Sequence, residues 1–206
     1  MDQKKLWKQK WIVEDRFAPN DFAKKSFSEI KKRSLKTLLD IGCGVGIDSV
    51  FFAQKGLRVT AVDFSESGIE KLKQSIKNKK TKTITPLLRD ITNLKFPPNS
   101  FDVIYAHLSL QYFDNRTTTK IFNKLYEILY PKGLFFIKCK FTDDRRYGKG
   151  KEIEKDMYKL KGHNRHFFSK EYMAEKLEGF KVLKIEKTSS KYKAYRSSFI
   201  EAVATK

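Results

Sequence analysis

The sequence predicts an α/β protein built on a mainly parallel, doubly wound sheet. From residue 35 onward, short apolar runs alternate with helical segments, and this alternation indicates βαβ units. The run Lys36–Ile41 is compact, apolar and ended by glycines, as expected for a buried parallel strand. The 206 residues, 40% of them hydrophobic, suffice for a sizeable core. We therefore expect a single domain over residues 1–206.

The segment before the first strand, residues 1–34, has polar helical character with scattered aromatic side chains. This pattern is typical of an amphipathic helix that packs over an apolar surface. We expect it to act as a helical lead-in or lid. Its aromatic residues are Trp7, Trp11, Phe17, Phe22 and Phe27.

Strands and helices then alternate through residues 35–141. Gly56 ends the first helix of this core, and Ser65 is placed to cap the second. Asp114 is placed to cap the third helix, which Pro131 and Gly133 stop. Right-handed crossovers put the carboxyl ends of the strands along one edge, where such sheets bind ligands. Strands are expected at 36–41, 58–62, 82–88, 101–106 and 134–140, and helices at 45–55, 65–78 and 114–130.

The remainder of the chain begins with a charged stretch that glycines interrupt. Residues 142–168 show no clear helix or strand pattern and are interpreted as a variable segment on the substrate side. Ser169 is placed to cap a helix that ends near residue 178. Two β segments, 180–187 and 194–205, then close the chain, so residues 169–206 are expected to form a helix and a β-hairpin.

The formal net charge of +20 is a hint of nucleic-acid binding. The charge is mostly Lys, however, and it is spread from Lys4 to Lys206, whereas Arg, the better bidentate reader of phosphates, is scarce. We therefore interpret it mainly as a lysine-rich surface. The N-terminus lacks the apolar core of a signal peptide, and no run is long enough to cross a bilayer. A soluble cytoplasmic protein with no membrane partner is expected.

The first strand runs into a glycine-rich loop, Asp40-Ile41-Gly42-Cys43-Gly44-Val45-Gly46. Glycines at this point let the backbone approach a ligand closely, and helix N-terminal amides follow. The dinucleotide fingerprint G-x-G-x-x-G would require glycine at position 47, which is Ile47. No Gly-Lys-Ser/Thr ends the loop, so it is not a Walker A loop either. Phosphate binding is therefore the poorer match.

Each of the first three strands ends in or next to an aspartate, namely Asp40, Asp63 and Asp90. The topology brings all three to the same edge of the sheet. Carboxylates there would repel a pyrophosphate but suit a cationic ligand that carries hydroxyls and an amine. Asp63 follows the glycines by about twenty residues, where a carboxylate can accept both hydrogen bonds of a ribose diol. Helix or turn capping is the alternative for Asp63 and Asp90. Cys43 and Cys139 alone cannot form a zinc site, and no metal is expected.

The chain contains, in order, L-L-D-I-G-C-G-V-G, A-V-D-F-S, R-D-I, F-D-V-I-Y and L-Y-P-K-G-L. In order and spacing these resemble the successive motifs of class I S-adenosylmethionine-dependent methyltransferases, over about residues 35–141. The resemblance implies a Rossmann-like sheet of seven strands, the last antiparallel, with helices on both faces. It also implies S-adenosylmethionine as cofactor and S-adenosylhomocysteine as product.

The resemblance further implies roles for individual residues. Gly42 and Gly44 would pass under the methionine part of the cofactor, with Asp40 supporting its amino group. Asp63 would hold the ribose hydroxyls, while Asp90 would accept from the adenine amine. The full set expected to bind the cofactor is Asp40, Gly42, Cys43, Gly44, Asp63, Phe64, Asp90, Ile91 and His107.

Methyl transfer from a sulfonium is an in-line displacement that relies mainly on proximity and orientation. A base is needed only if the acceptor must lose a proton, and the candidates are His107, His166 and Tyr112. The run from Arg165 to Ser169 is similar to one that borders the acceptor pocket in tellurite- and thiopurine-methylating enzymes, which makes Arg165 and Phe167 candidate substrate residues. A small-molecule acceptor is expected. The alternatives are an RNA or protein substrate, or a non-catalytic module that binds the cofactor.

Overall fold

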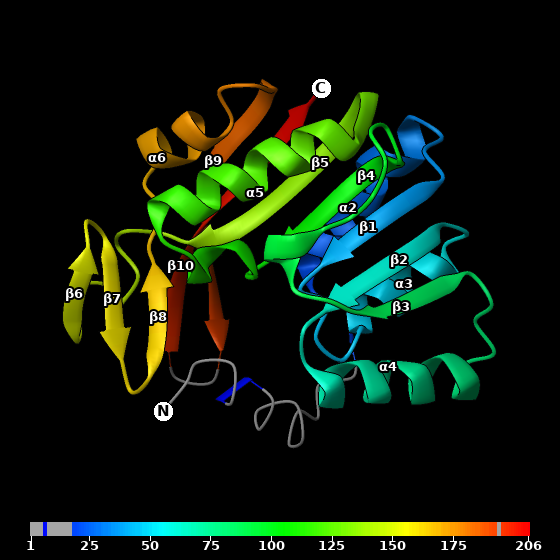
Figure 1. The fold of residues 1–206 in the computed structure, drawn as a ribbon, viewed down its shortest axis with the longest axis horizontal. Coiled ribbons are helices and arrows are strands. Elements are labelled where there is room, and N and C mark those ends of the chain that lie inside the picture. The colour runs from blue at the N-terminus through cyan, green and yellow to red at the C-terminus, as the bar shows by residue number, and fades with distance from the viewer. Residues whose placement is uncertain (1–5, 8–17, 193–194) are drawn as a thin grey trace.

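A seven-stranded sheet forms the centre of the molecule, with strand order β3-β2-β1-β4-β5-β10-β9 (Figure 1). The computed structural model describes residues 6–7, 18–192 and 195–206. β10 runs antiparallel to both of its neighbours, whereas β1 to β5 are parallel. The predicted fold class is therefore confirmed, including the antiparallel last strand. The strands are β1 (Thr37–Ile41), β2 (Arg58–Asp63), β3 (Ile84–Leu88), β4 (Phe101–His107), β5 (Leu129–Lys140), β9 (Lys181–Tyr192) and β10 (Tyr195–Thr205).

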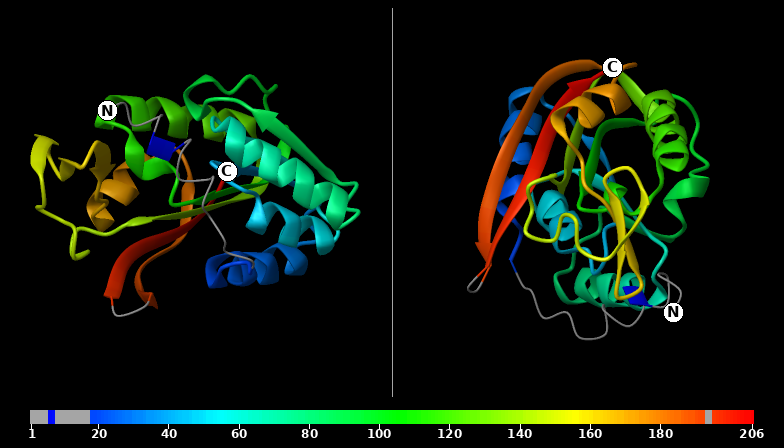
Figure 2. Two further views of the ribbon diagram at one scale, coloured as in Figure 1. Left: turned by 90° about the horizontal axis from the view of Figure 1, so that it is seen from below. Right: turned by 90° about the vertical axis from the view of Figure 1, so that its left-hand side faces the viewer.

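Helices cover both faces of this sheet (Figure 2). On one face, Phe22, Val50 and Leu72 pack with the inward residues of β4 and β5. On the other face, Ile121 and Met173 pack against the opposite side of the same strands. Because both faces of β1, β4 and residues 134–137 of β5 are buried, these stretches are mostly apolar. The helices are α2 (Asp21–Lys32), α3 (Ile47–Gln54) and α4 (Glu66–Asn78) on the first face, and α5 (Asn115–Ile128) and α6 (Lys170–Lys176) on the second.

The three predicted helix caps are confirmed. The Ser65 hydroxyl accepts from Gly68 N at 3.3 Å, the Asp114 carboxylate accepts from Thr117 N at 2.7 Å, and the Ser169 hydroxyl accepts from Tyr172 N at 3.1 Å. Each cap satisfies a backbone N–H that has no partner inside its helix. These caps fix where α4, α5 and α6 begin.

Within the described part of the lead-in segment, a helix covers residues 21–32. α2 begins at Asp21, with Asn20 as N-cap, and buries Phe22 and Ile30. Trp11 and Phe17 lie outside the described residues. Among the residues that are described, no helix is long and apolar enough to span a bilayer.

The variable segment contains strands that the sequence pattern did not reveal. β6 (Lys151–Glu154), β7 (Met157–Leu160) and β8 (His163–His166) form a separate antiparallel sheet, which stands beside the main sheet (Figure 1). Each strand has four residues, too few for a clear alternation of apolar and polar side chains. Met157 is buried, whereas most side chains of β6 are exposed. The turns between the strands contain Asp156 and Lys161, non-glycine residues with positive φ.

Candidate active site

The glycine loop after β1 touches the segment after β4. Gly42, Gly44 and Gly46 have φ values of 73°, 56° and 75°, a region that side-chain-bearing residues rarely adopt. A Cβ at position 42 would lie 2.3 Å from Ser109 Cβ, so only glycine allows this close approach. The loop therefore joins the carboxyl ends of β1 and β4 at one edge of the sheet.

Asp40 is buried beneath this loop, with an exposed fraction of 3%. Its carboxylate accepts a hydrogen bond from Ser49 Oγ. Burial first, and then the neighbouring charges of Asp48 and Asp63, raise the pKa of Asp40 to about 8 against the opposing hydrogen bond from Ser49. The surroundings of Asp40 are thus strongly acidic, and a nearby positive charge would favour its ionised form.

Asp48 is a site residue that sequence reasoning missed. Its side chain lies in the first turn of α3, where an acid is ordinarily an exposed partner of the helix dipole. Here it is 7% exposed and accepts from Tyr105 Oη at 3.1 Å and from Asn20 N at 3.2 Å. The Asn20 side-chain amide also donates to it. Asp48 therefore links the start of α2 to the first turn of α3, directly after the glycine loop, and no local pattern signals that contact.

The carboxylates of Asp63 and Asp90 both accept hydrogen bonds from backbone N–H groups. Asp63 is 4% exposed, and its two oxygens accept from Gly44 N at 2.8 Å and from Ser65 N at 2.7 Å. Asp90 is half-buried and caps the short 3₁₀ helix η1 (Ile91–Asn93) through Thr92 N at 2.9 Å. The capping alternative thus describes contacts that both residues make. A carboxylate oxygen has two lone pairs, so each can also accept from a ligand.

The end of β4 carries a histidine and a buried serine hydroxyl. The His107 ring stacks on Tyr105 and on Phe22, with centroid distances of 6.4 and 6.2 Å. Ser109 Oγ is buried, beside Gly42, and has no hydrogen-bond partner. A buried hydroxyl without a partner is costly unless something else binds it.

These features fit S-adenosylmethionine better than a phosphate-rich cofactor. The acids around the loop match a ligand with positive charge and hydroxyl groups, and Ser109 Oγ leaves a polar atom for it to contact. No cluster of His, Cys, Asp and Glu suited to a metal ion occurs within the described ranges.

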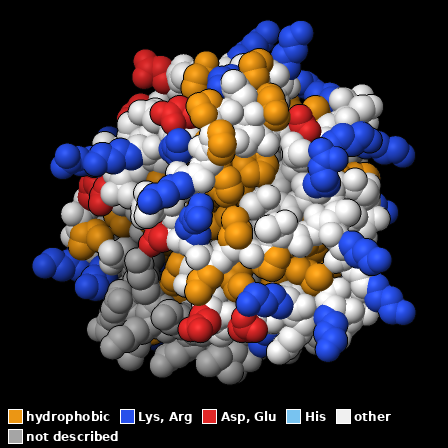
Figure 3. Space-filling view, turned by 45° about the vertical axis from the view of Figure 1, so that its right-hand side comes forward, with side chains coloured by type: hydrophobic (Ala, Val, Ile, Leu, Met, Phe, Trp, Pro, Cys, Tyr) orange, Lys and Arg blue, Asp and Glu red, His pale blue; other side chains and the backbone are white. Residues whose placement is uncertain are grey.

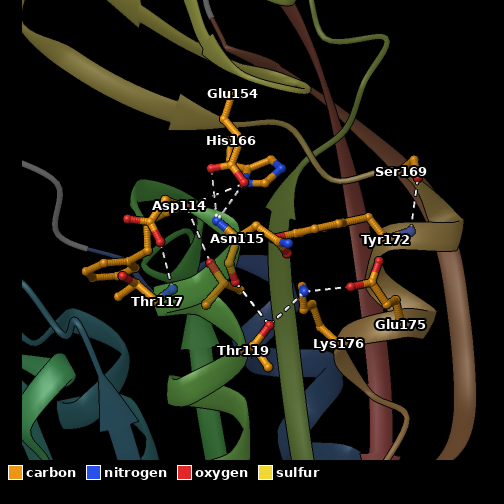
Figure 4. Close-up of polar contacts among 12 residues, drawn as sticks. Asp114, Asn115, Thr117, Thr119, Glu154, His166, Ser169, Tyr172, Glu175 and Lys176 are labelled. Carbon is orange, nitrogen blue, oxygen red and sulfur yellow. Dashed lines mark hydrogen bonds and ion pairs between the residues drawn. The ribbon is translucent and has the colours of Figure 1, made fainter.

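The predicted substrate-side residues separate into two groups. Tyr112, in the 3₁₀ helix η2 (Leu110–Tyr112), lies 5.9 Å from the Arg165 guanidinium carbon, measured from its ring centre. In contrast, His166 and Phe167 are 2% and 1% exposed. Figure 4 shows His166 packed between Glu154 and the start of α5, and burial lowers its pKa. Phe167 packs against Tyr147, with ring centres 5.6 Å apart.

Residues 38–133, from β1 into β5, match a family model described as a methyltransferase domain. A methyltransferase structure from Methanosarcina mazei, described as S-adenosylmethionine-dependent, superposes with a TM-score of 0.75 at 20% identity, covering 86% of this chain and 96% of that one. The chain contains a class I S-adenosylmethionine-dependent methyltransferase domain.

Two further comparisons concern methyltransferases with named substrates. Phosphoethanolamine N-methyltransferase 1 of Triticum aestivum is 31% identical over 105 residues, which are 50% of this chain and 21% of the wheat enzyme. The structure of the 1,6-didemethyltoxoflavin-N1-methyltransferase of Burkholderia thailandensis holds bound 1,6-didemethyltoxoflavin and S-adenosylhomocysteine. It has a TM-score of 0.72 at 18% identity and covers 90% of this chain and 78% of that one. The matched segments cover between 21% and 41% of the length of three curated relatives.

Proposed function

We propose that the protein transfers a methyl group from S-adenosylmethionine to a small-molecule acceptor. The observation that carries the proposal is the cluster of buried carboxylates at the glycine loop, Asp40, Asp48 and Asp63, in a chain of net charge +20. Carboxylates gathered on an otherwise positive protein favour a ligand with a sulfonium and an ammonium group, whose positive charge in turn favours the ionised form of Asp40. The same carboxylates disfavour a pyrophosphate.

The proposed cofactor contacts follow the loop and the strand ends. Gly42, Cys43 and Gly44 run beneath the methionine part, where Asp40 lies directly below the loop. Asp63 accepts from the ribose hydroxyls with the lone pairs that Gly44 N and Ser65 N leave. The adenine contacts are assigned to Phe64, Asp90 and Ile91.

When bound, the cofactor supplies a methyl group that its positive sulfur has already activated. The chain itself orients the acceptor and excludes water. For an acceptor that must lose a proton, we propose His107 as the base, because it ends β4 beside the loop that holds Ser109. Tyr112 is the second candidate. His166 is too deeply buried to be included in this proposal.

The acceptor is proposed to be a small molecule because the methyltransferases named for phosphoethanolamine and for 1,6-didemethyltoxoflavin act on small molecules. An RNA or protein substrate is a second candidate, favoured by the net charge of +20. Against it, Lys and Arg side chains on the face in Figure 3 are scattered around an apolar band and form no single patch.

Calorimetry with S-adenosylhomocysteine tests the cofactor site. We expect the wild type to bind and Asp63→Ala to bind roughly 10- to 100-fold more weakly, since hydrogen bonds to a charged group are lost. Asp143→Ala, which removes an exposed carboxylate paired with Lys187, is the control and should bind as the wild type does. Absence of binding by the wild type overturns the proposal. An unchanged affinity in Asp63→Ala shows that the ribose is held elsewhere.

A screen with labelled cofactor then tests the acceptor class, using thiols, amines, metalloid oxyanions and bulk RNA. Label in a small molecule supports the leading proposal, whereas label in RNA alone selects the second candidate.

A further inference from the structure

Three cationic side chains gather where β5 and β8 end. They are Lys140, Arg146 and Arg165. Burial and the positive charges of Arg165 and Arg145 lower the pKa of Arg146. Burial also lowers the pKa of Lys140, and Arg146 and Arg165 contribute to that shift. The positive charges are therefore close enough to repel one another.

One buried carboxylate, Asp144, faces this cluster, and its oxygens are already engaged. Oδ2 accepts from Lys140 Nζ at 2.8 Å and from Ser198 N at 3.0 Å, while Oδ1 accepts from Arg146 N at 3.1 Å. Asp144 thus neutralises Lys140. Neither guanidinium forms an ion pair with any residue in the described ranges. Asp144 also attracts Arg146 electrostatically, but it is shared with Lys140, so the cluster keeps an excess of positive charge.

Arg165 also presents a buried donor to this region. Its Nε is buried and has no hydrogen-bond partner, although a guanidinium normally uses its donors when it is removed from water. Its guanidinium carbon lies 5.9 Å from the centre of the Tyr112 ring. Trp7 packs edge-on against Tyr112 at 5.0 Å and against His163 at 5.6 Å. The Tyr112 ring, against which Trp7 packs, thus lies beside the guanidinium.

We propose that Arg165, assisted by Arg146, binds the oxyanion of the methyl acceptor, a phosphate ester or a carboxylate, against the ring of Tyr112. A planar guanidinium matches the geometry of either oxyanion. Ser109 lies against Gly42 of the glycine loop, and Tyr112 comes three residues after Ser109. An acceptor bound beside Tyr112 therefore lies along the sheet edge that leads to the cofactor loop. The inference rests on the proposed methyl transfer and narrows its acceptor to anionic small molecules.

Calorimetric titrations with and without saturating S-adenosylhomocysteine test this subsite. The probes are inorganic phosphate, phosphoethanolamine, 3-aminopropanoate and ethanolamine, of which the last lacks the oxyanion. We expect at least one oxyanion probe to bind, and ethanolamine to bind at least about tenfold more weakly because it cannot pair with the guanidinium. A preference for phosphoethanolamine over 3-aminopropanoate identifies the oxyanion as a phosphate ester, and the reverse identifies a carboxylate.

Arg165→Gln should weaken oxyanion binding by roughly 10- to 100-fold and leave the S-adenosylhomocysteine affinity unchanged, which shows that the variant is folded. Arg165→Lys keeps the charge but not the planar fork and should be intermediate. Arg196→Gln removes the same charge from an exposed arginine that bonds to Ser189 and serves as control. Equal binding of oxyanions by Arg165→Gln and the wild type overturns the inference, as does binding of no oxyanion probe. Failure of the wild type to bind S-adenosylhomocysteine overturns the proposed function instead. The oxyanion titrations made without S-adenosylhomocysteine then still show whether Arg165 binds an oxyanion.

Discussion

At the scale of single residues, Asp40 has a strongly raised pKa. The pKa of its carboxyl is about 8 in the folded protein, against an ordinary value of 3.8, because burial disfavours the charged form. Between these two values the folded protein holds a proton that the unfolded chain has released. Linkage then requires the free energy of unfolding to fall as pH rises from about 4 to about 8, and to level off above.

The contribution of Asp40 can be isolated by denaturant melts between pH 5 and pH 9. The wild type should lose stability with a slope of up to about 1.4 kcal/mol per pH unit beyond that of Asp40→Asn, which cannot ionise. Saturating S-adenosylhomocysteine should flatten the slope, because its ammonium group favours the ionised carboxylate. Parallel pH profiles for the wild type and Asp40→Asn would show that Asp40 is ionised across this range.

At the scale of elements, the glycine loop depends on contacts as well as on backbone conformation. Gly46 is the N-cap of α3 with a φ of 75°, and a Cβ there would lie 2.3 Å from Leu72 Cδ1 of α4. Gly56 also has a positive φ, 93°, but a Cβ there would meet nothing within 4 Å. The two positions therefore separate backbone strain from crowding.

Gly46→Ala should destabilise the protein more than Gly56→Ala. Both variants carry the strain of a side chain at positive φ, about 1–2 kcal/mol. Gly46→Ala adds the cost of displacing Leu72, roughly 1–3 kcal/mol for overpacking a core. Urea melts of the two variants and the wild type give the difference directly. Equal losses would mean that α4 moves away from the loop at little cost.

At the scale of the whole molecule, the β9–β10 hairpin is held to the sheet partly by a buried ion pair. Lys138 of β5 and Glu201 of β10 lie 2.6 Å apart, with side-chain exposures of 12% and 7%. Thr188 of β9 donates to the same carboxylate at 2.9 Å. β5 and both strands of the β9–β10 hairpin thus meet at one charge pair, and removal of one partner leaves a buried charge unpaired.

Glu201→Leu should lower the free energy of unfolding by about 3–5 kcal/mol, because Lys138 remains buried and uncompensated. The double variant Lys138→Met/Glu201→Leu should recover most of that loss. The control is Glu186→Leu, which breaks the exposed Lys184–Glu186 pair and should cost at most about 1 kcal/mol. A double variant as unstable as Glu201→Leu alone would show that packing, and not the unpaired charge, dominates.

The sequence alone determined the order of elements in the main sheet, the glycine loop, the class of domain and the helix caps at Ser65, Asp114 and Ser169. Each of these depends on a signal within a few residues, such as a glycine after an apolar run or a hydroxyl before a helical pattern. The acids at the strand ends followed from topology, because parallel strands bring their carboxyl ends to one edge. The small β6–β8 sheet was not predicted, because strands of four residues are too short to show an alternation of apolar and polar side chains.

Only the tertiary structure decided which of these side chains meet. Asp48 is joined to Tyr105, 57 residues away, and the burial of His166 and Phe167 reflects how β8 packs beside η2 and α5. Arg146 precedes β6 and Arg165 lies in β8. The antiparallel pairing of β6, β7 and β8 brings these two side chains close together. Such contacts depend on how distant elements pack, and nothing in the local sequence records the angle and register of that packing.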